Sequence, residues 1–352
     1  MQQLPEDVIE EILSRLHVKD LMRFKSVSKK WNSIISSQHL INLHLKKSIS
    51  SPSHRRIFIP HSKSVVYKGL QDDTEELPLP PGAIAYFFGA FDGLLCYLQN
   101  HDDATRIRIW NPATRVSKTA DLKLKFDNFV SWFGRESSDD EYKLILGIRP
   151  HGKQLANNHT LLVTLYVDGD SSNFSAQEID LDQLVFKPYE EGTFFCGIVH
   201  WPANRNSYWV VFTYDLGQKS VGEIAMPVTS QNHLCGLGVV DRCLSAICGN
   251  CEGFCVIYEV WIMKEYGIKE SWTKSMNIPH PAGNIQYMYL VGVSDYGDIF
   301  FRSSTEHVNL FVYNVGEKKY TATLVSDGYF VKTYVETLVS PNLGKKRTVG
   351  AT

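Results

Sequence analysis

The sequence predicts a multidomain protein, α then all-β, in which a three-helix N-terminal module precedes a β-propeller-like domain of about six blades. The first supporting observation is a change in composition: residues 1–47 hold one proline and no glycine, whereas residues 55–340 carry nearly all of the 24 glycines. The second is an internal repeat of strand-like segments in the later part. A chain of 352 residues with 43% apolar content is long enough for one small and one large domain.

The N-terminal module shows helical periodicity from its first residues. Val8, Ile9, Ile12, Leu13 and Leu16 form a wide apolar stripe on a first helix that follows Pro5. Further apolar sets at 21–27 and 31–35 indicate two more helices, and 40–45 adds an amphipathic turn or two. A unit of about 45 residues has too little interior to bury all of these side chains. We therefore expect one of its apolar faces to be an interface.

The polar segment 48–54, which includes Pro52, is typical of a linker. It sets the expected boundaries at 1–47 for the helical module, 48–54 for the linker and 55–340 for the β domain. Residues 341–352, with the basic run Lys345-Lys346-Arg347, are expected to form a flexible tail.

The β domain repeats a Gly- or Cys-marked apolar strand followed by a strand that ends in an aromatic residue. The gaps between successive aromatic markers are 56, 48, 47 and 52 residues, and the markers are Trp110, Tyr166, Tyr214, Trp261 and Tyr313. A period near 50 with several strands per unit indicates a propeller, and one aromatic per unit favours packing between blades over a ligand cage. Strands near 57–59 and 65–67 are expected to pair with a strand near 334–338 and close the ring. A pair of β-sandwiches is the alternative fold.

The segment Leu4-Pro5-Glu6-Asp7-Val8-Ile9-Glu10-Glu11-Ile12-Leu13-Ser14-Arg15-Leu16, continued by Val18 to Trp31, resembles a plant F-box. The later part resembles the plant F-box-associated domain, a kelch-like interaction domain, through Asp92-Gly93-Leu94-Leu95, Trp110-Asn111-Pro112-Ala113-Thr114-Arg115 and Val199-His200-Trp201. This resemblance implies the substrate-recognition subunit of an SCF-type ubiquitin ligase. Its F-box would bind a Skp-family adaptor, and through it cullin, while the C-terminal domain binds a target protein.

The resemblance also assigns residues. Nine positions match the adaptor face of the family or the core beneath it: Leu4, Pro5, Ile9, Leu13, Leu16, Val18, Leu21, Val27 and Trp31. His17 departs from the pattern, because the family usually has proline between the first two helices. Proline would stiffen that joint, so its absence is expected to weaken adaptor binding without abolishing it.

Acidic residues are concentrated in one region, since residues 71–103 contain seven acidic side chains and no lysine or arginine. Solvated loops would explain this bias. A rim that steers a basic target would also explain it, with candidate target-binding residues Asp72, Asp73, Glu75, Glu76, Asp102 and Asp103. Glu190-Glu191 is a further acidic pair. The family includes S-locus F-box proteins, so a self-incompatibility receptor for a basic ribonuclease is an alternative function.

Other functional classes have little support. The net charge of −2 gives no sign of a nucleic-acid partner, and no apolar run approaches the roughly 18 residues of a membrane span. The absence of a signal-peptide pattern and an odd number of cysteines, seven, predict a cytoplasmic and/or nuclear protein.

No cofactor, metal or enzyme motif is evident. Cys243, Cys248, Cys251 and Cys255 lack the paired spacing of a zinc site, and no HExxH motif or nucleophile elbow occurs. We therefore predict a non-catalytic receptor subunit of a ligase. A kelch-like scaffold that never enters a ligase is the competing class, and adaptor binding distinguishes the two.

Overall fold

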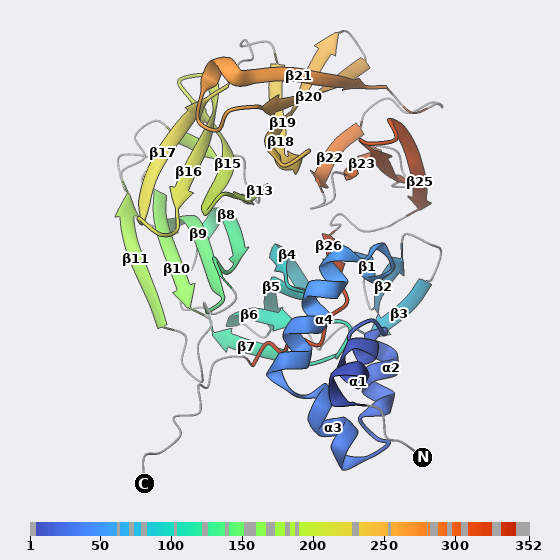
Figure 1. The fold of residues 1–352 in the computed structure, drawn as a ribbon. Helices are drawn as coiled ribbons and strands as arrows, with labels where there is room; N and C mark the ends of the chain where they lie inside the picture. The colour runs from blue at the N-terminus through green and yellow to red at the C-terminus, as the bar shows by residue number, and fades with distance from the viewer. Residues whose placement is uncertain are drawn as a thin grey trace.

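The computed structural model describes residues 5–61, 64–69, 74–78, 83–101, 104–121, 126–137, 141–150, 160–166, 173–179, 184–186, 190–226, 232–252, 255–279, 281, 288–293, 298–303, 309–325 and 332–342. A helical module at the N-terminus lies beside a ring of sheets (Figure 1). The predicted order, α then β, is confirmed. None of the helices among these residues is long and apolar enough to cross a membrane.

The helical module contains four helices, so the expectation of three was wrong. They are α1 (Glu6–Leu13), α2 (Val18–Phe24), α3 (Lys29–Ile35) and α4 (Gln38–Ser50). The Ser28 hydroxyl accepts a hydrogen bond from the Trp31 amide, and the Ser37 hydroxyl accepts one from the Leu40 amide, both at 3.1 Å. These serines cap α3 and α4 by satisfying amides that have no partner within the helix.

Helix α4 also changes the expected linker. It continues to Ser50, and the 3₁₀ turn η1 (Pro52–His54) follows directly, so most of segment 48–54 is helical. The sequence pattern missed this extension because two of the buried side chains of α4, His44 and Ser48, are polar. A polar residue on the buried face interrupts the apolar stripe by which a helix is recognised.

The described residues form six sheets, here called blades 1–6, which surround the ring's axis (Figure 1) and are antiparallel except where the short β13 pairs with β8. Blade 1 joins β26 (Lys332–Val335) to β1 (Arg55–His61), β2 (Ser64–Gly69) and β3 (Thr74–Pro78). Blade 2 contains β4 (Ala83–Phe91), β5 (Leu94–His101), β6 (Ala104–Trp110) and β7 (Ser117–Asp121). Blade 3 contains β8 (Phe126–Gly134), β9 (Lys143–Pro150), β10 (Thr160–Tyr166), β11 (Asn173–Ile179) and the short β13 (Glu190–Glu191).

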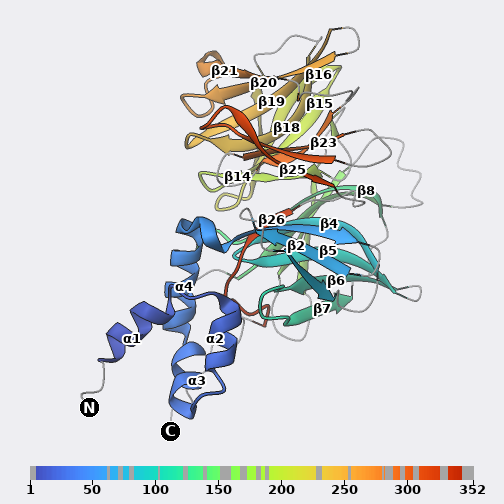
Figure 2. The same cartoon turned by 90° about the vertical axis from the view of Figure 1, so that its right-hand side faces the viewer.

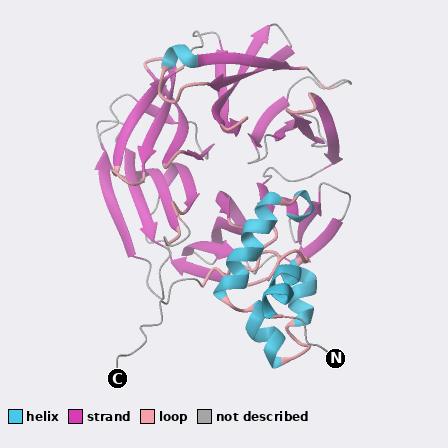
Figure 3. Ribbon diagram, in the orientation of Figure 1, coloured by secondary structure: helices cyan, strands magenta, loops and turns pink. Residues whose placement is uncertain are grey.

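The other three blades follow in chain order. Blade 4 contains β12 (Leu184–Phe186), β14 (Thr193–Phe195), β15 (Ile198–Arg205), β16 (Tyr208–Asp215) and β17 (Ser220–Ala225). Blade 5 contains β18 (Asn232–Val240), β19 (Cys243–Glu252), β20 (Cys255–Met263) and β21 (Trp272–Ile278), with the 3₁₀ turn η2 (Lys269–Ser271) before β21. Blade 6 contains β22 (Met288–Val293), β23 (Asp298–Ser303), β24 (Asn309–Asn314) and β25 (Lys319–Val325). Figure 3 shows that the helices gather in the N-terminal module while the ring is built of strands.

Blade 1 is the composite sheet that the sequence predicted. Strand β26 pairs with β1 in antiparallel register, from Arg55 opposite Val335 to Phe58 opposite Lys332. Five blades are thus made mainly from one stretch of chain each, and the sixth is shared by both ends of the β domain. This pairing closes the ring and occupies an edge of β1 that would otherwise be open.

The aromatic markers lie within two residues of the ends of the third strands of blades 2–6. Trp110, Tyr214 and Tyr313 are buried, and each belongs to an apolar cluster that joins two neighbouring blades. Trp110, for example, packs with Phe58 of blade 1 and Phe87 of blade 2. The prediction of inter-blade packing is confirmed for these three residues.

Strand direction defines two faces of the ring. Strand β1 begins where η1 ends, so its start lies on the face beside the helices, called here the helix-side face (Figure 2). The turn between β4 and β5 lies on the same face, because the Thr337 hydroxyl beyond β26 donates to the Asp92 carbonyl at 2.8 Å. Connections between second and third strands therefore lie on the opposite face.

Candidate protein-interaction site

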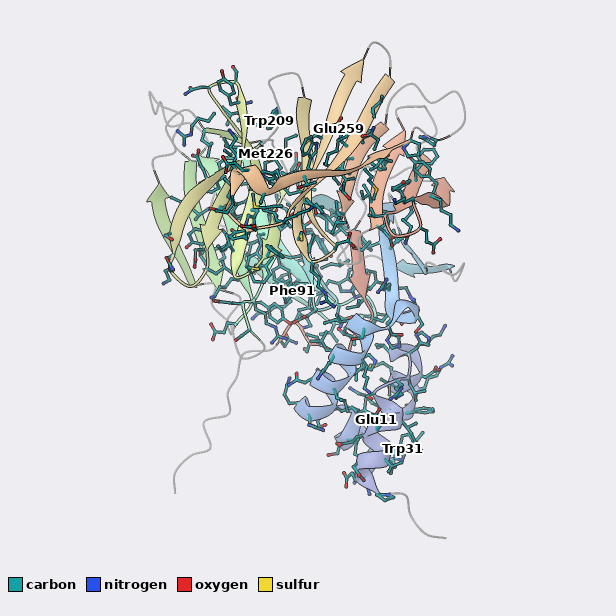
Figure 4. The ribbon with its side chains drawn as sticks, turned by 45° about the horizontal axis from the view of Figure 1, so that its top comes forward. Glu11, Trp31, Phe91, Trp209, Met226 and Glu259 are labelled. Carbon is teal, nitrogen blue, oxygen red and sulfur yellow. The ribbon has the colours of Figure 1, made fainter. Side chains whose placement is uncertain are left out.

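Four large apolar side chains of α1–α3 and their connecting turns remain exposed: Val8 and Ile12 on α1, Met22 on α2, and Val27 in the turn before α3. Ile49, near the end of α4, is exposed as well. Ile12 is 49% exposed and Val27 is 65% exposed. Helices α1–α3 lie at one side of the propeller, and Glu11 and Trp31 mark the helical module in Figure 4. Exposed apolar side chains gathered on one small module indicate a surface that a partner covers.

The structure separates the nine predicted adaptor-binding residues by depth. Leu13, Val18 and Leu21 form the buried core of the module. Three more are partly buried against this core: Ile9, Leu16 and Trp31. Pro5 and Val27 are exposed, and Leu4 lies outside the described residues. Sequence reasoning left out Val8, Ile12 and Met22, although all three lie within the apolar pattern that it used.

Salt bridges tie α1 to α4 beside this surface. Glu11 Oε1 accepts hydrogen bonds from Lys47 Nζ at 2.8 Å and from Arg15 Nε at 3.0 Å. The Lys47 bond, followed by the Arg15 bond, lowers the pKa of the Glu11 carboxyl below its usual 4.5. These pairs are exposed, and such pairs contribute little stability each.

A buried polar network fills the place where the sequence suggested a linker. His44 Nε2 donates to the Leu16 carbonyl at 3.0 Å, so the other ring nitrogen of a neutral His44 accepts from Ser48 Oγ at 3.3 Å. Because the Ser48 proton is then used, His54 Nδ1 donates to Ser48 Oγ at 2.9 Å. Burial lowers the pKa of His44, and burial followed by the nearby His44 and His17 lowers the pKa of His54 to about 4. Both rings are therefore neutral at pH 7.

His17 connects this network to the other end of the chain. Its ring stacks on His54 with centroids 4.8 Å apart, and its Nδ1 lies 3.1 Å from Glu336 Oε2. The second carboxylate oxygen of Glu336 accepts from Arg56 Nε at 3.2 Å, and the Glu336 amide donates to the His54 carbonyl. The residue that replaces the usual proline thus takes part in the junction between helices and propeller.

Residues Glu336–Asn342, here called the C-terminal segment, run between the helices and blade 2. Leu338 packs into the core of the helical module, and the next residue, Val339, packs into the core shared by blades 2 and 3. Asn111, fully buried, donates to the carbonyls of Thr337 at 2.9 Å and Val339 at 2.7 Å. The expected flexible tail, 341–352, therefore begins within a packed segment; residues 343–352 lie outside the described residues.

The candidate target-binding residues lie largely outside the described residues: Asp72, Asp73, Asp102 and Asp103 do, and Glu75 and Glu76 are described only as backbone of β3. The strand ends that flank them are informative. Gly69 and Thr74 lie at the helix-side face, whereas His101 and Ala104 lie at the opposite face. Strands of seven or eight residues place these faces about 20 Å apart. The strand ends that flank the two acidic segments therefore lie on different faces of the ring.

The acidic pair Glu190-Glu191 lies on the inner strand β13, which pairs with β8, rather than on an outer loop. Glu191 forms an ion pair with Lys332 of β26. Burial lowers the pKa of Lys332 to about 8. This ion pair joins blades 1 and 3 across the inside of the ring. The Glu191 carboxylate therefore binds a residue of its own chain.

His200 in the Val-His-Trp motif is also structural. Its Nδ1 donates to the Thr193 carbonyl at 3.0 Å, so its Nε2 accepts from the Tyr266 hydroxyl at 2.7 Å. Burial lowers the pKa of His200 to about 4. The contact ties blade 4 to the loop that precedes β21 of blade 5.

Comparisons with known proteins agree with this architecture. A family profile described as the F-box domain matches residues 1–43, and one described as the F-box associated beta propeller domain matches residues 28–342. An Arabidopsis thaliana F-box/kelch-repeat protein is 27% identical over 377 residues, which cover 96% of each chain. The Arabidopsis thaliana F-box protein CPR1 is 22% identical over 321 residues, which cover 82% of this chain and 76% of that protein. The chain therefore belongs to the plant F-box proteins that carry an F-box-associated β-propeller domain.

Proposed function

We propose that this chain is the non-catalytic substrate-recognition subunit of an SCF-type ubiquitin ligase. Helices α1–α3 bind a Skp-family adaptor, which connects to cullin, and the propeller binds a target protein. The exposed apolar set Val8, Ile12, Met22 and Val27 is the observation that supports this proposal most strongly. The ligase complex performs the chemistry, and this chain supplies proximity. The proposal includes a cytoplasmic and/or nuclear location.

The helices that carry this set also carry charged residues. Arg15 follows α1, Lys19 and Arg23 lie on α2, and the first turn of α1 is acidic. An apolar centre with a polar rim is the usual anatomy of a protein interface. A small number of such apolar anchors carries most of the binding energy.

The test replaces two anchors in the full-length chain and measures binding to a purified Skp-family adaptor by calorimetry. Ile12→Asp with Val27→Asp should weaken binding about 700-fold or more, because two hot-spot residues at about 2 kcal/mol each contribute about 4 kcal/mol and every 1.4 kcal/mol is tenfold in affinity. Val221→Asp with Ile268→Asp is the matched control, since those side chains are 43% and 48% exposed on the propeller. Equal affinity of the two double variants would contradict the proposal and favour a scaffold outside the ligase.

The target-binding role of the propeller is the second part of the proposal. The strand ends that flank the acidic segments 72–76 and 102–103 lie on different faces, so we expect a single target with a basic face to contact one segment only. Reversal to lysine of Asp72 and Asp73 in one variant, and of Asp102 and Asp103 in another, should slow association with the target in only one case. The target must first be recovered by affinity purification, and on-rates insensitive to both reversals would refute acidic steering.

A further inference from the structure

The core of the F-box is completed by a residue from the far end of the chain. Leu338, 6% exposed, packs in one cluster with Leu13, Val18 and Leu21. A three-turn helix and its short neighbours have little interior of their own, so one leucine is a substantial share of what they bury. The F-box is therefore not self-contained.

The C-terminal segment is held on the propeller side by buried hydrogen bonds. Asn111 binds the Thr337 and Val339 carbonyls, and the Thr337 hydroxyl binds the Asp92 carbonyl. Because side chains alternate along an extended chain, Leu338 points to the F-box while Val339 enters the propeller core. The segment thus belongs to both domains at once.

The same segment also contacts the F-box through a buried carboxylate. Glu336 contacts His17 of the α1–α2 joint and Arg56 of β1 through its two carboxylate oxygens, and its side chain is 7% exposed. The segment directly follows β26, whose pairing with β1 closes the ring. Its position therefore depends on closure of blade 1.

We propose that docking of the C-terminal segment holds the F-box helices in their adaptor-binding form. The chain would then bind the adaptor, and so join the ligase, only when the ring of the propeller is closed. This inference rests on the proposed function for the adaptor, and it adds a condition to it. A chain with an open propeller leaves the F-box core without Leu338 and the α1–α2 joint without Glu336. Such a chain presents a loosened F-box to the adaptor.

The experiment compares full-length Leu338→Ala with a matched control, Leu244→Ala. Leu244 is buried in the apolar cluster between blades 4 and 5, away from the F-box. Amide hydrogen exchange of α2 should quicken about 30-fold or more in Leu338→Ala and stay unchanged in the control, because loss of a buried leucine acts on the unit that contains it. Glu336→Gln, which keeps the shape of the side chain, should quicken the same amides by a smaller factor.

Adaptor binding provides the second readout, with a purified Skp-family adaptor as the probe. On heating, Leu338→Ala should lose adaptor binding below the temperature at which its propeller unfolds, whereas wild type and control should lose both together. Unchanged α2 exchange in Leu338→Ala, or equal acceleration in the control, would overturn the inference. A wild-type chain that binds no adaptor would instead overturn the proposed function, and the exchange data would still decide whether the segment holds the helices.

Discussion

Asn111 provides the sharpest test of how the C-terminal segment is held. Its amide donates to two buried carbonyls, and its oxygen accepts from the amides of Ala113 at 2.9 Å and Thr114 at 3.1 Å. Replacement by alanine removes all four hydrogen bonds. We expect the protein to lose stability well beyond the effect of an ordinary turn substitution.

The magnitude follows from the groups left behind. Two buried carbonyls without partners cost about 1–3 kcal/mol each, and loss of the turn contacts adds about 1 kcal/mol. Asn111→Ala should therefore cost about 3–7 kcal/mol, a large fraction of the stability of a typical domain. Asn314 is the matched control, because it follows the aromatic marker Tyr313 at the end of β24 as Asn111 follows Trp110, accepts from the Glu317 amide and donates to Asp298. Asn314 is only half-buried, so Asn314→Ala should cost about 1 kcal/mol.

Urea unfolding followed by tryptophan fluorescence measures both variants. Asn111→Asp adds a pH test, because its carboxylate would face two carbonyl oxygens and would be relieved by protonation. The stability of Asn111→Asp relative to wild type should therefore improve as the pH falls below 5. A cost of Asn111→Ala no greater than that of Asn314→Ala would refute the reasoning.

Three further predictions concern pH and backbone conformation. As the pH falls from 6.5 to about 4, the unfolded state binds protons at His54 and His200 that the folded state does not bind. Each site therefore removes up to about 3 kcal/mol from the free energy of unfolding. In urea titrations across this pH range, His200→Gln should abolish the part of the loss that comes from His200. The Glu11 carboxyl has a pKa that is lowered in the folded state, so its ionised form stabilises the fold above its ordinary pKa and this effect is lost in acid. Glu11→Gln should therefore reduce the melting temperature at pH 7 but leave it unchanged well below pH 4.5. Gly93→Ala should destabilise the protein far more than Gly267→Ala. Both glycines have φ near +80°, but only at Gly93 would the new Cβ lie 2.5 Å from atoms of β26 and the C-terminal segment. Similar melting temperatures of the two variants would contradict this prediction.

Much of the propeller could be predicted from the sequence because its repeat is enforced by packing. Trp110, Tyr214 and Tyr313 must each fill the space between two blades, so the same kind of residue recurs at the same place. The closing strand was also predictable, since a ring needs its first strands paired. The F-box core followed from helical periodicity in the same way.

The junction could not be predicted, for two physical reasons. Buried polar side chains such as His44 and Ser48 resemble a solvated segment in sequence, and only their partners reveal that they are buried. The contact of Leu338 with Leu13 joins residues at opposite ends of the chain, and no local pattern reports such a contact. Sequence reasoning groups the acidic segments 72–76 and 102–103 because they are close in sequence. The direction of the flanking strands places the ends of those strands on different faces of the ring.

The composite blade also has a kinetic consequence. The side chains of Arg56 and Glu336 meet although they are 280 positions apart, and closing a loop of that length costs about 5 kcal/mol of chain entropy. A ribosome adding about 5–20 residues each second would need roughly 14–56 seconds to travel from one to the other. During that interval β1 has emerged while its partner β26 has not yet been made. We expect nascent chains of this protein to depend on chaperones that cover strand edges, and to aggregate when synthesis is slowed between blades 2 and 6.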